Sequence, residues 1–427
     1  MTSSLSTDVE RPAAPTQTAQ VPGAVRSGAL LFAATLAGVA ATYLFYLVSG
    51  RLLGPDDYGT LAAVLSLLTI VSLPFSALQM ALSRDVSSIV TQEGDDHATA
   101  LTRALLRWAG LATIALLAVF LALSVPLEQL LQLDSIEPLL FAAVAVAPII
   151  LGPILLGDVQ GRQQFSRLAT ATAFPLVFRC ALFLVLAVIG WRLYGALFSI
   201  AVASLAGFAL PVWWRRDLLR HVRRPTVTVR PFLVALVPVM VALLAVTALT
   251  NVDVLIVKAR MSSEDAGIYG AASAFAKVAF FLPMAIVGVL FPRVAARRAR
   301  GEETADILGR TLIVTVGFCA VLFAFYGLLG TPLVKLTYGA EFEEAGSLLG
   351  LFGIGMTFFS IANVLVSYHL SRHEPRFAWV VAAAAVGQAV ALALVPAGLE
   401  TFLWVNAGIG IGIVVAHELV MGSSAGA

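Results

Sequence analysis

Apolar segments of about 20 residues recur along the whole of this sequence. A helix rises about 1.5 Å per residue, so each segment spans the roughly 30 Å hydrocarbon layer of a bilayer. Membrane β-strands are shorter and alternate apolar with polar residues, which these segments do not do. Because backbone groups within lipid must hydrogen-bond internally, the segments predict an all-α, polytopic membrane protein.

Composition supports this interpretation. Hydrophobic residues make up 59% of the chain and charged residues only 12%, whereas charged residues form about a quarter of a soluble domain. We predict about 12 transmembrane helices. Their expected ranges are 28–49, 59–82, 104–124, 138–157, 170–190, 194–214, 236–257, 267–291, 308–329, 345–370, 377–397 and 401–421.

The distribution of Lys and Arg predicts the orientation. Residues 1–27 are polar and rich in Ser, Thr, Ala and Pro, which is typical of a disordered tail. Most Lys and Arg residues fall in loops on the same side as this tail, and few fall on the other side. Positively charged loops remain in the cytoplasm. We therefore expect a cytoplasmic-membrane protein with a cytoplasmic tail and both termini in the cytoplasm.

One motif occurs twice. Residues 51–59 read RLLGPDDYG and residues 260–267 read RMSSEDAG, and a Leu-Pro pair follows at similar spacing, ending at Pro74 and Pro283. In each case the motif joins the first and second spans of one half of the chain. Acidic residues at the start of a helix are favourable there, so the motif is interpreted as a structural turn that marks a repeat.

The repeat divides the chain into two halves of six spans, 28–214 and 236–421, joined by a basic cytoplasmic linker at 215–235. The linker's charge is typical of anchoring against anionic membrane lipids. Six is an even number, so both halves start on the same side and form parallel repeats. Repeats of this kind enclose a central cavity and rock against each other, which is the architecture of an alternating-access transporter.

Three segments resemble a known family. They are RLLGPDDYGTLAAVLSLLTIVSLP (51–74), NVDVLIVKARMSSEDAGIYGAASAFAKVAFFLP (251–283) and LVKLTYGAEFEEAGSLLGLFGIGMTFFSIANVLVSYHL (333–370). They are similar to the polysaccharide biosynthesis or oligosaccharide flippase family of the multidrug/oligosaccharidyl-lipid/polysaccharide exporter superfamily. The resemblance implies two six-helix bundles that translocate a polyprenyl-diphosphate-linked oligosaccharide, the repeat unit of a cell-envelope polysaccharide. That family has no invariant catalytic motif, so the resemblance transfers few site residues.

Two cations lie near the middle of predicted spans. Ionisable groups in lipid are costly, and each is a candidate functional residue. Arg179 and Lys277 are expected to bind the cargo's diphosphate, and Ser273 shares a small, polar helical stripe with Lys277. Alternatively, Arg179 contacts backbone carbonyls of neighbouring helices and Lys277 forms a structural ion pair.

Asp253 is the acid placed most clearly inside a span. Thr250 lies on the same broad face and Asn251 is adjacent. These three residues predict an ion-coupling site for sodium or a proton. Asp253 is equally suited to pair with Lys277, Lys258 or Arg260.

Polar side chains on the last spans are further candidates. Asn363, His369 and Gln388 are predicted to hydrogen-bond either sugar or a neighbouring helix. Tyr43 and Tyr46 in the first span, with Gln79 in the second, form a weaker candidate sugar surface.

Two other functions are considered. A multidrug or small-cation antiporter of the same superfamily would favour acidic cavity walls, whereas Arg179 and Lys277 favour an anionic cargo. A membrane polysaccharide polymerase or ligase would need a large outer loop, and the predicted outer loops are short. The sequence has no phosphate-binding loop and no nucleophile or metal-ligand motif. We therefore expect no enzymatic activity, no cofactor or metal site, and no nucleic-acid partner.

Overall fold

The computed structural model describes residues 21–219, 228–280, 304–372 and 374–422, with scattered residues between 281 and 303. All regular secondary structure in these parts is helical, which confirms the all-α prediction. Ten of the described helices are long and apolar enough to cross a membrane. The protein is therefore a multi-pass membrane protein.

The first half of the chain forms six helices. They are α1 (Val21–Gln92), α2 (Asp95–Ala122), α3 (Ser124–Leu130), α4 (Glu137–Gly161), α5 (Phe165–Val188) and α6 (Arg192–Trp214), followed by the 3-10 turn η1 (Arg216–Leu219). The short α3 follows α2 directly, and the other five α-helices are long enough to span the bilayer.

The second half of the chain forms long helices separated by several short ones. They are α7 (Arg230–Leu249), α8 (Val252–Arg260), α9 (Ser263–Ala276), η2 (Lys277–Phe280), α11 (Ala305–Thr337), η3 (Ala340–Phe342), α12 (Glu343–Ser371), α13 (Arg376–Leu394), α14 (Leu399–His417) and the π-helical turn η4 (Glu418–Gly422).

The ten candidate membrane helices correspond to the predicted spans in a specific way. α1 is 72 residues long and contains the first two predicted spans, with a break at Gly54, whose φ of 77° favours glycine. The seventh predicted span is divided into α7 and α8. The eighth begins in α9 and continues beyond residue 280, outside the continuously described chain.

The predicted tail and linker are only partly described. The predicted tail comprises residues 1–27. Residues 1–20 lie outside the described residues, and α1 begins at Val21. The linker, 215–235, includes residues 220–227, which also lie outside them.

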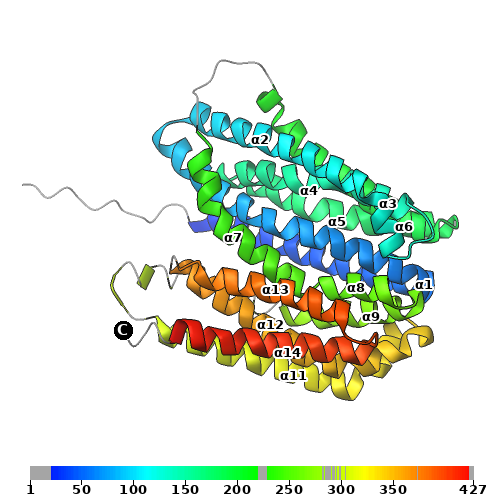
Figure 1. The fold of residues 1–427 in the computed structure, drawn as a ribbon. Helices are drawn as coiled ribbons and strands as arrows, with labels where there is room; N and C mark the ends of the chain where they lie inside the picture. The colour runs from blue at the N-terminus through cyan, green and yellow to red at the C-terminus, as the bar shows by residue number, and fades with distance from the viewer. Residues whose placement is uncertain are drawn as a thin grey trace, which may run out of the picture.

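Two groups of helices lie side by side (Figure 1). α4 and α5 pack on α1, and α6 packs on both α4 and α5; in the other group α12 packs between α11 and α14. α1 also contacts α7 and α9, so it connects the groups. The start of α1 and the C-terminus lie at the same end of the molecule, as an even number of crossings requires.

The repeated motifs meet at the opposite end, where α1 packs against α9. A Cβ atom at Gly59 would lie 2.6 Å from the carbonyl oxygen of Ser263, and one at Gly267 would collide with the backbone of Pro55. The Tyr58 hydroxyl lies 3.0 Å from that of Tyr338 beside this contact. The glycines are therefore needed because two backbones touch there.

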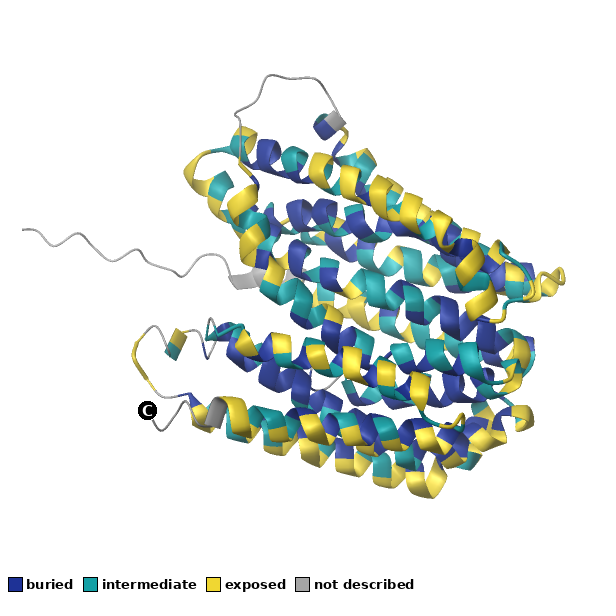
Figure 2. Ribbon diagram, in the orientation of Figure 1, coloured by how far each residue is buried: buried dark blue, intermediate teal, exposed yellow. Residues whose placement is uncertain are grey.

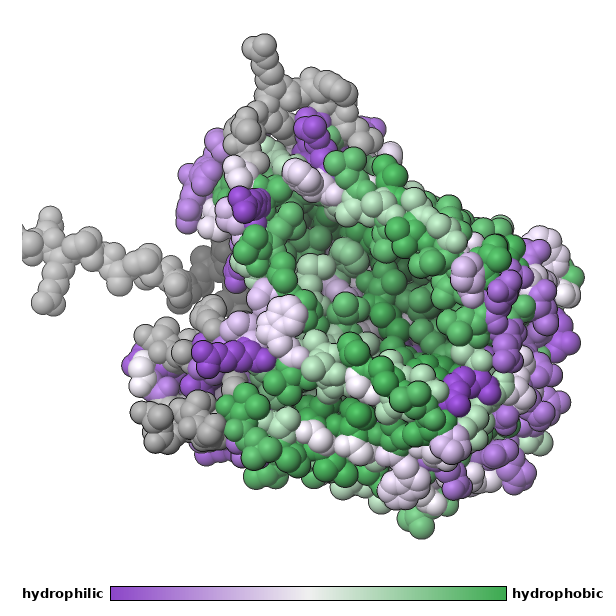
Figure 3. Space-filling model, viewed as in Figure 1, coloured by the Kyte–Doolittle hydropathy of each residue, from purple (hydrophilic) through white to green (hydrophobic). Residues whose placement is uncertain are grey.

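The surface suits a bilayer. Buried residues lie mainly where helices face each other, and exposed residues face outward (Figure 2). On the face shown in Figure 3, hydrophobic residues cover the middle, including a hollow between the two groups of helices, and hydrophilic residues lie toward both ends. α2 contributes exposed Trp108, Leu111 and Ile114. A lipid environment accounts for this apolar surface.

Candidate functional site

The break between α7 and α8 positions a buried lysine. α7 ends at Leu249, and the Asn251 side-chain amide donates to the Thr247 carbonyl oxygen at 2.9 Å. The Asn251 amide oxygen then accepts a hydrogen bond of 2.9 Å from the Lys277 ammonium. Asn251 therefore turns toward Lys277, whereas the Thr250 hydroxyl bonds to carbonyls of its own helix.

Lys277 and Asn251 line a cavity of about 100 Å³ between α1 and the α7–α9 region. The wall from α1 carries hydroxyls of Tyr46, Tyr58 and two smaller residues; the opposite wall includes Ser273. Its lining residues are Tyr46, Tyr58, Ala62, Leu65, Ser66, Thr69, Asn251, Val254, Gly270, Ser273, Ala274 and Lys277. The Ser273 hydroxyl has no hydrogen-bond partner within the described part of the chain. The cavity thus combines one cation with several hydroxyls.

Asp253 belongs to a separate polar network behind this cavity. Its carboxylate accepts hydrogen bonds from the Tyr269 hydroxyl at 2.7 Å and from the Asn406 amide at 2.9 Å. Gln388 donates to the Asn406 amide oxygen at 2.7 Å and to the Leu249 carbonyl oxygen at 2.9 Å. The network therefore ties α8 and α9 to α13 and α14.

The alternative pairings of Asp253 are not found. Lys258 instead donates to the Ser263 hydroxyl at 2.6 Å, and Arg260 bonds to carbonyl oxygens at the end of α13. Lys277 interacts with Asp253 electrostatically but donates to Asn251. The carboxylate is therefore held by neutral donors.

Arg179 lies on α5 beside α1, outside the set of residues that line the cavity. Its Nη2 donates to the Thr42 hydroxyl at 3.4 Å, and its guanidinium carbon lies 4.4 Å from the centre of the Phe45 ring. The Phe45 ring is in turn in edge contact with Tyr46, which lines the cavity. The buried Nε of Arg179 has no hydrogen-bond partner in the described residues. Arg179 is thus next to the cavity, because its partner Thr42 precedes the cavity residue Tyr46 by one helical turn of α1.

The other predicted polar residues are dispersed. Gln388 belongs to the Asp253 network, and Asn363 is buried on α12 outside the cavity lining. His369 lies at the end of α12, where its Nε2 is 3.0 Å from that of His417. The structure therefore brings together Lys277, Ser273 and Asn251, with Tyr46 on the opposite wall.

Sequence reasoning missed Tyr269 and Asn406, which hold the Asp253 carboxylate. Asn406 is an isolated amide within an otherwise apolar span, and such residues commonly hydrogen-bond across membrane helices. This isolation is the sequence signal that could have identified Asn406 as an interhelical hydrogen-bonding residue. Its partner could not be identified because Asp253 lies 153 positions earlier in the chain.

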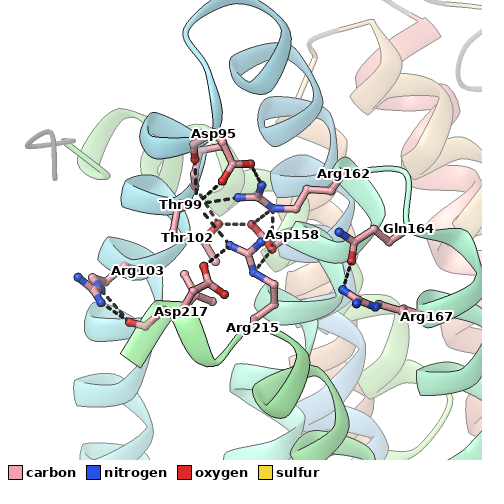
Figure 4. Close-up of polar contacts among 12 residues, drawn as sticks. Asp95, Thr99, Thr102, Arg103, Asp158, Arg162, Gln164, Arg167, Arg215 and Asp217 are labelled. Carbon is pink, nitrogen blue, oxygen red and sulfur yellow. Dashed lines mark hydrogen bonds and ion pairs between the residues drawn. The ribbon is translucent and has the colours of Figure 1, made fainter. Parts of the chain in front are cut away.

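A second missed cluster surrounds Asp158 (Figure 4). Asp158 is fully buried and accepts hydrogen bonds from the Thr102 hydroxyl at 2.9 Å and from Arg162 Nε at 3.1 Å. It also forms an ion pair with Arg215, whose Nε lies 3.0 Å from the carboxylate. Arg162 also contacts Asp95. The predicted fourth span ends at residue 157, which leaves Asp158 outside it. The cluster joins α2, α4 and the end of α6.

Asp158 and Arg162 are spaced one helical turn apart, which is the sequence signal for such a pair. The side chains of Arg162 and Arg215 are only 7% and 8% exposed. This cluster lies at the end of the helices opposite the repeated motifs. Its charges satisfy one another, so its arrangement fits a structural fastening rather than a binding site.

Comparisons with known proteins place the chain. Residues 24–297 match the family model described as polysaccharide biosynthesis protein. No curated protein sequence matches. Among solved structures, the chain is similar to the lipid II flippase MurJ in an inward closed conformation, with a TM-score of 0.71 and 12% identity, covering 93% of this chain and 87% of that one.

Two transporters of the MATE family are also similar. An inward-facing MATE transporter of the MOP superfamily gives a TM-score of 0.69 at 12% identity, covering 90% of this chain and 95% of that one. The Vibrio cholerae transporter VcmN gives 0.64 at 15% identity, covering 93% and 98%. These TM-scores establish a shared fold. The family match covers more than half of the chain and confirms the resemblance seen in the sequence. The chain is a member of the polysaccharide biosynthesis protein family.

Proposed function

We propose that this protein translocates a polyprenyl-diphosphate-linked oligosaccharide across the cytoplasmic membrane by alternating access. Family membership supports a role in polysaccharide biosynthesis. The fold shared with a lipid II flippase shows that this architecture serves a lipid-linked glycan elsewhere. The observation that carries the proposal is the cavity where Lys277 faces a wall of hydroxyls.

The chemistry of the cavity favours an anionic glycolipid. Lys277 is the one charged residue among those that line it, and an ammonium is suited to a phosphate. Hydroxyls and the Asn251 amide are suited to the hydrogen bonds of a sugar. A cavity for organic cations would instead carry an acid on its wall, and the nearest buried acid, Asp253, is engaged by Tyr269 and Asn406. A multidrug antiporter is therefore less well supported.

Transport requires movement of the two halves. A cavity of about 100 Å³ is smaller than the 300–1,000 Å³ typical of ligand sites, so the cargo needs the helices to separate. We assign the moving parts to residues 28–214 and 236–421, connected by 215–235. α1 and α9 touch where the repeated motifs meet, which closes that end. The proposal places both termini in the cytoplasm and this contact at the outer face.

Asp253 is the proposed coupling residue. A buried carboxylate without a direct cationic partner is costly within a membrane, and binding of sodium or a proton would compensate its charge. The Gln388 side-chain oxygen is a buried acceptor with no partner in the described residues, close to Asn406. Oxygen atoms of this kind are the ligands that hard cations prefer. Asp253 lies next to the break between α7 and α8. Neutralising its carboxylate would therefore affect Asn251 at that break, and through Asn251 its hydrogen-bond partner Lys277.

Transport of a fluorescent lipid-linked glycan in proteoliposomes tests the function. Lys277→Gln should lower the rate at least about tenfold, as expected when a buried charge-assisted contact of roughly 1.5–3 kcal/mol is lost. Lys335→Gln is the matched control, since Lys335 is 44% exposed and pairs with Glu343. Equal rates for Lys277→Gln and the control would reject the proposed cargo site. Transport of organic cations but not of the glycan would favour the antiporter.

A further inference from the structure

The lipid tail of the proposed cargo needs a path out of the protein. A long hydrocarbon chain does not enter a cavity lined by hydroxyls, so it must leave between helices while the headgroup is bound. The structure has a groove next to the cavity that suits this purpose. The position of the tail rests on the proposed function, which supplies the cargo.

The groove runs between α1 and α5 and has a volume of about 240 Å³. On α1 it extends from Ala34 to Tyr43, which corresponds to about 14 Å, or half of the hydrocarbon layer. Gly38 lets α5 approach closely there, since a Cβ atom would lie 2.8 Å from the Leu176 side chain. Its length and position fit one extended hydrocarbon chain.

The polar atoms of the groove are already engaged. The Thr35 hydroxyl donates to the Leu31 carbonyl oxygen at 2.8 Å, and the Thr42 hydroxyl donates to that of Gly38 at 2.9 Å. The Thr172 hydroxyl likewise bonds to Leu168 in its own helix. These threonine hydroxyls therefore need no polar ligand, and the threonine methyl groups add to a wall that a hydrocarbon chain can contact.

Arg179 lies beside the end of the groove that Thr42 and Tyr43 line. It donates to Thr42, which lines the groove, and it lies over the ring of Phe45, which is in edge contact with Tyr46 of the cavity. Tyr43 of the groove and Tyr46 of the cavity are in edge contact, with ring centroids 6.0 Å apart. The guanidinium thus lies at the junction of the two spaces.

The charge of Arg179 specifies the kind of ligand. Among the described residues no carboxylate forms an ion pair with it, and its buried Nε is unsatisfied. A guanidinium in this condition is costly inside a membrane. A phosphate at the junction would neutralise it, and a chain attached to that phosphate would have the groove directly beside it.

We propose that the α1–α5 groove holds the prenyl chain of the cargo while Arg179 holds the phosphate to which the chain is attached. The headgroup then occupies the cavity beside Lys277, and the tail leaves along α1 and α5. Resident phospholipid in the groove is the competing occupant that the experiment must distinguish.

The test compares two fluorescent prenyl-diphosphate sugars in proteoliposomes, one with a long polyprenyl chain and one with a geranyl chain. Val39→Phe fills the groove, and Val185→Phe makes the same change on α5 at an exposed position outside it. Val39→Phe should lower transport of the long-chain substrate about tenfold and leave the geranyl substrate within about twofold. Arg179→Gln should slow both substrates, and Val185→Phe neither.

Photo-crosslinking gives an answer that does not depend on the folding of any variant. A diazirine in the prenyl chain of the long substrate should label peptides from α1 and α5 of the unaltered protein. Labelling of other helices, or labelling by a diazirine phospholipid that excess cargo does not displace, would overturn the inference. Equal effects of Val39→Phe and Val185→Phe would also overturn it while leaving the transport function intact. Absence of glycan transport by the unaltered protein would remove the proposed function and this inference together.

Discussion

A Cβ atom at Gly59 would lie 2.6 Å from the carbonyl oxygen of Ser263, so the two repeats touch through their backbones. This close contact closes one end of the molecule, beside the Tyr58–Tyr338 hydrogen bond that also joins the two halves. The halves can separate there by breaking the backbone packing and the Tyr58–Tyr338 hydrogen bond, and can re-form both contacts as they move. The repeated motif therefore acts as a packing surface between the halves.

Enlarging this glycine should open that end. Gly59→Val should destabilise the closed contact by about 1–3 kcal/mol, the usual cost of overpacking, and shift the protein toward a state that is open there. A cysteine introduced at Thr69, on the cavity wall, should then react faster with a membrane-impermeant maleimide. Gly110→Val is the control, because open space surrounds Gly110. No difference in labelling between the variants would show that the contact does not control access.

Asp253→Asn should uncouple transport from its driving ion. The amide retains an acceptor for Tyr269 or Asn406 but loses the charge that a cation would neutralise. We expect glycan transport down its own gradient to persist while acceleration by an imposed sodium or proton gradient disappears. Asp217→Asn, at a 41% exposed side chain, is the control. Full ion dependence in Asp253→Asn would exclude the carboxylate as the coupling group.

Removing Asp158 should be strongly destabilising. Asp158→Ala leaves the buried guanidiniums of Arg162 and Arg215 without their shared carboxylate, and breaking a buried pair in this way costs about 3–5 kcal/mol. Thermal unfolding in detergent should show a much lower midpoint than for the unaltered protein. Asp217→Ala removes only a partly exposed partner of Arg215, so its effect should stay below about 1 kcal/mol. Similar midpoints for the two variants would contradict the fastening role.

The Gln388–Asn406 bond should be measurable by a double-mutant cycle. Both side chains are buried, and the bond is 2.7 Å long. Gln388→Leu and Asn406→Leu should each destabilise the protein, with a coupling free energy of about 0.6–1.7 kcal/mol, the range found for membrane interhelical bonds. Denaturant unfolding of the two single variants and the double variant gives this value. Additive effects would show that the bond contributes nothing of its own.

Much of the fold could be predicted from local sequence. Apolar segment length against bilayer thickness identified the membrane-spanning character, and the repeated motif predicted an internal duplication. The same reasoning placed Lys277 and Ser273 on one face of a helix, and both residues line the cavity. These features depend on helical geometry and on composition within about 20 residues, which the chain displays directly.

The partners of buried charges depended on the tertiary structure. Sequence left Asp253 with three candidate cations, whereas the folded chain gives it Tyr269 and Asn406 from two other helices. Arg179 was expected to face the same space as Lys277, but it lies at the edge, between the cavity and the α1–α5 groove. Helical spacing fixes which residues share a face. Which faces meet is set by the rotation and crossing of helices far apart in the chain, so only tertiary packing decides it.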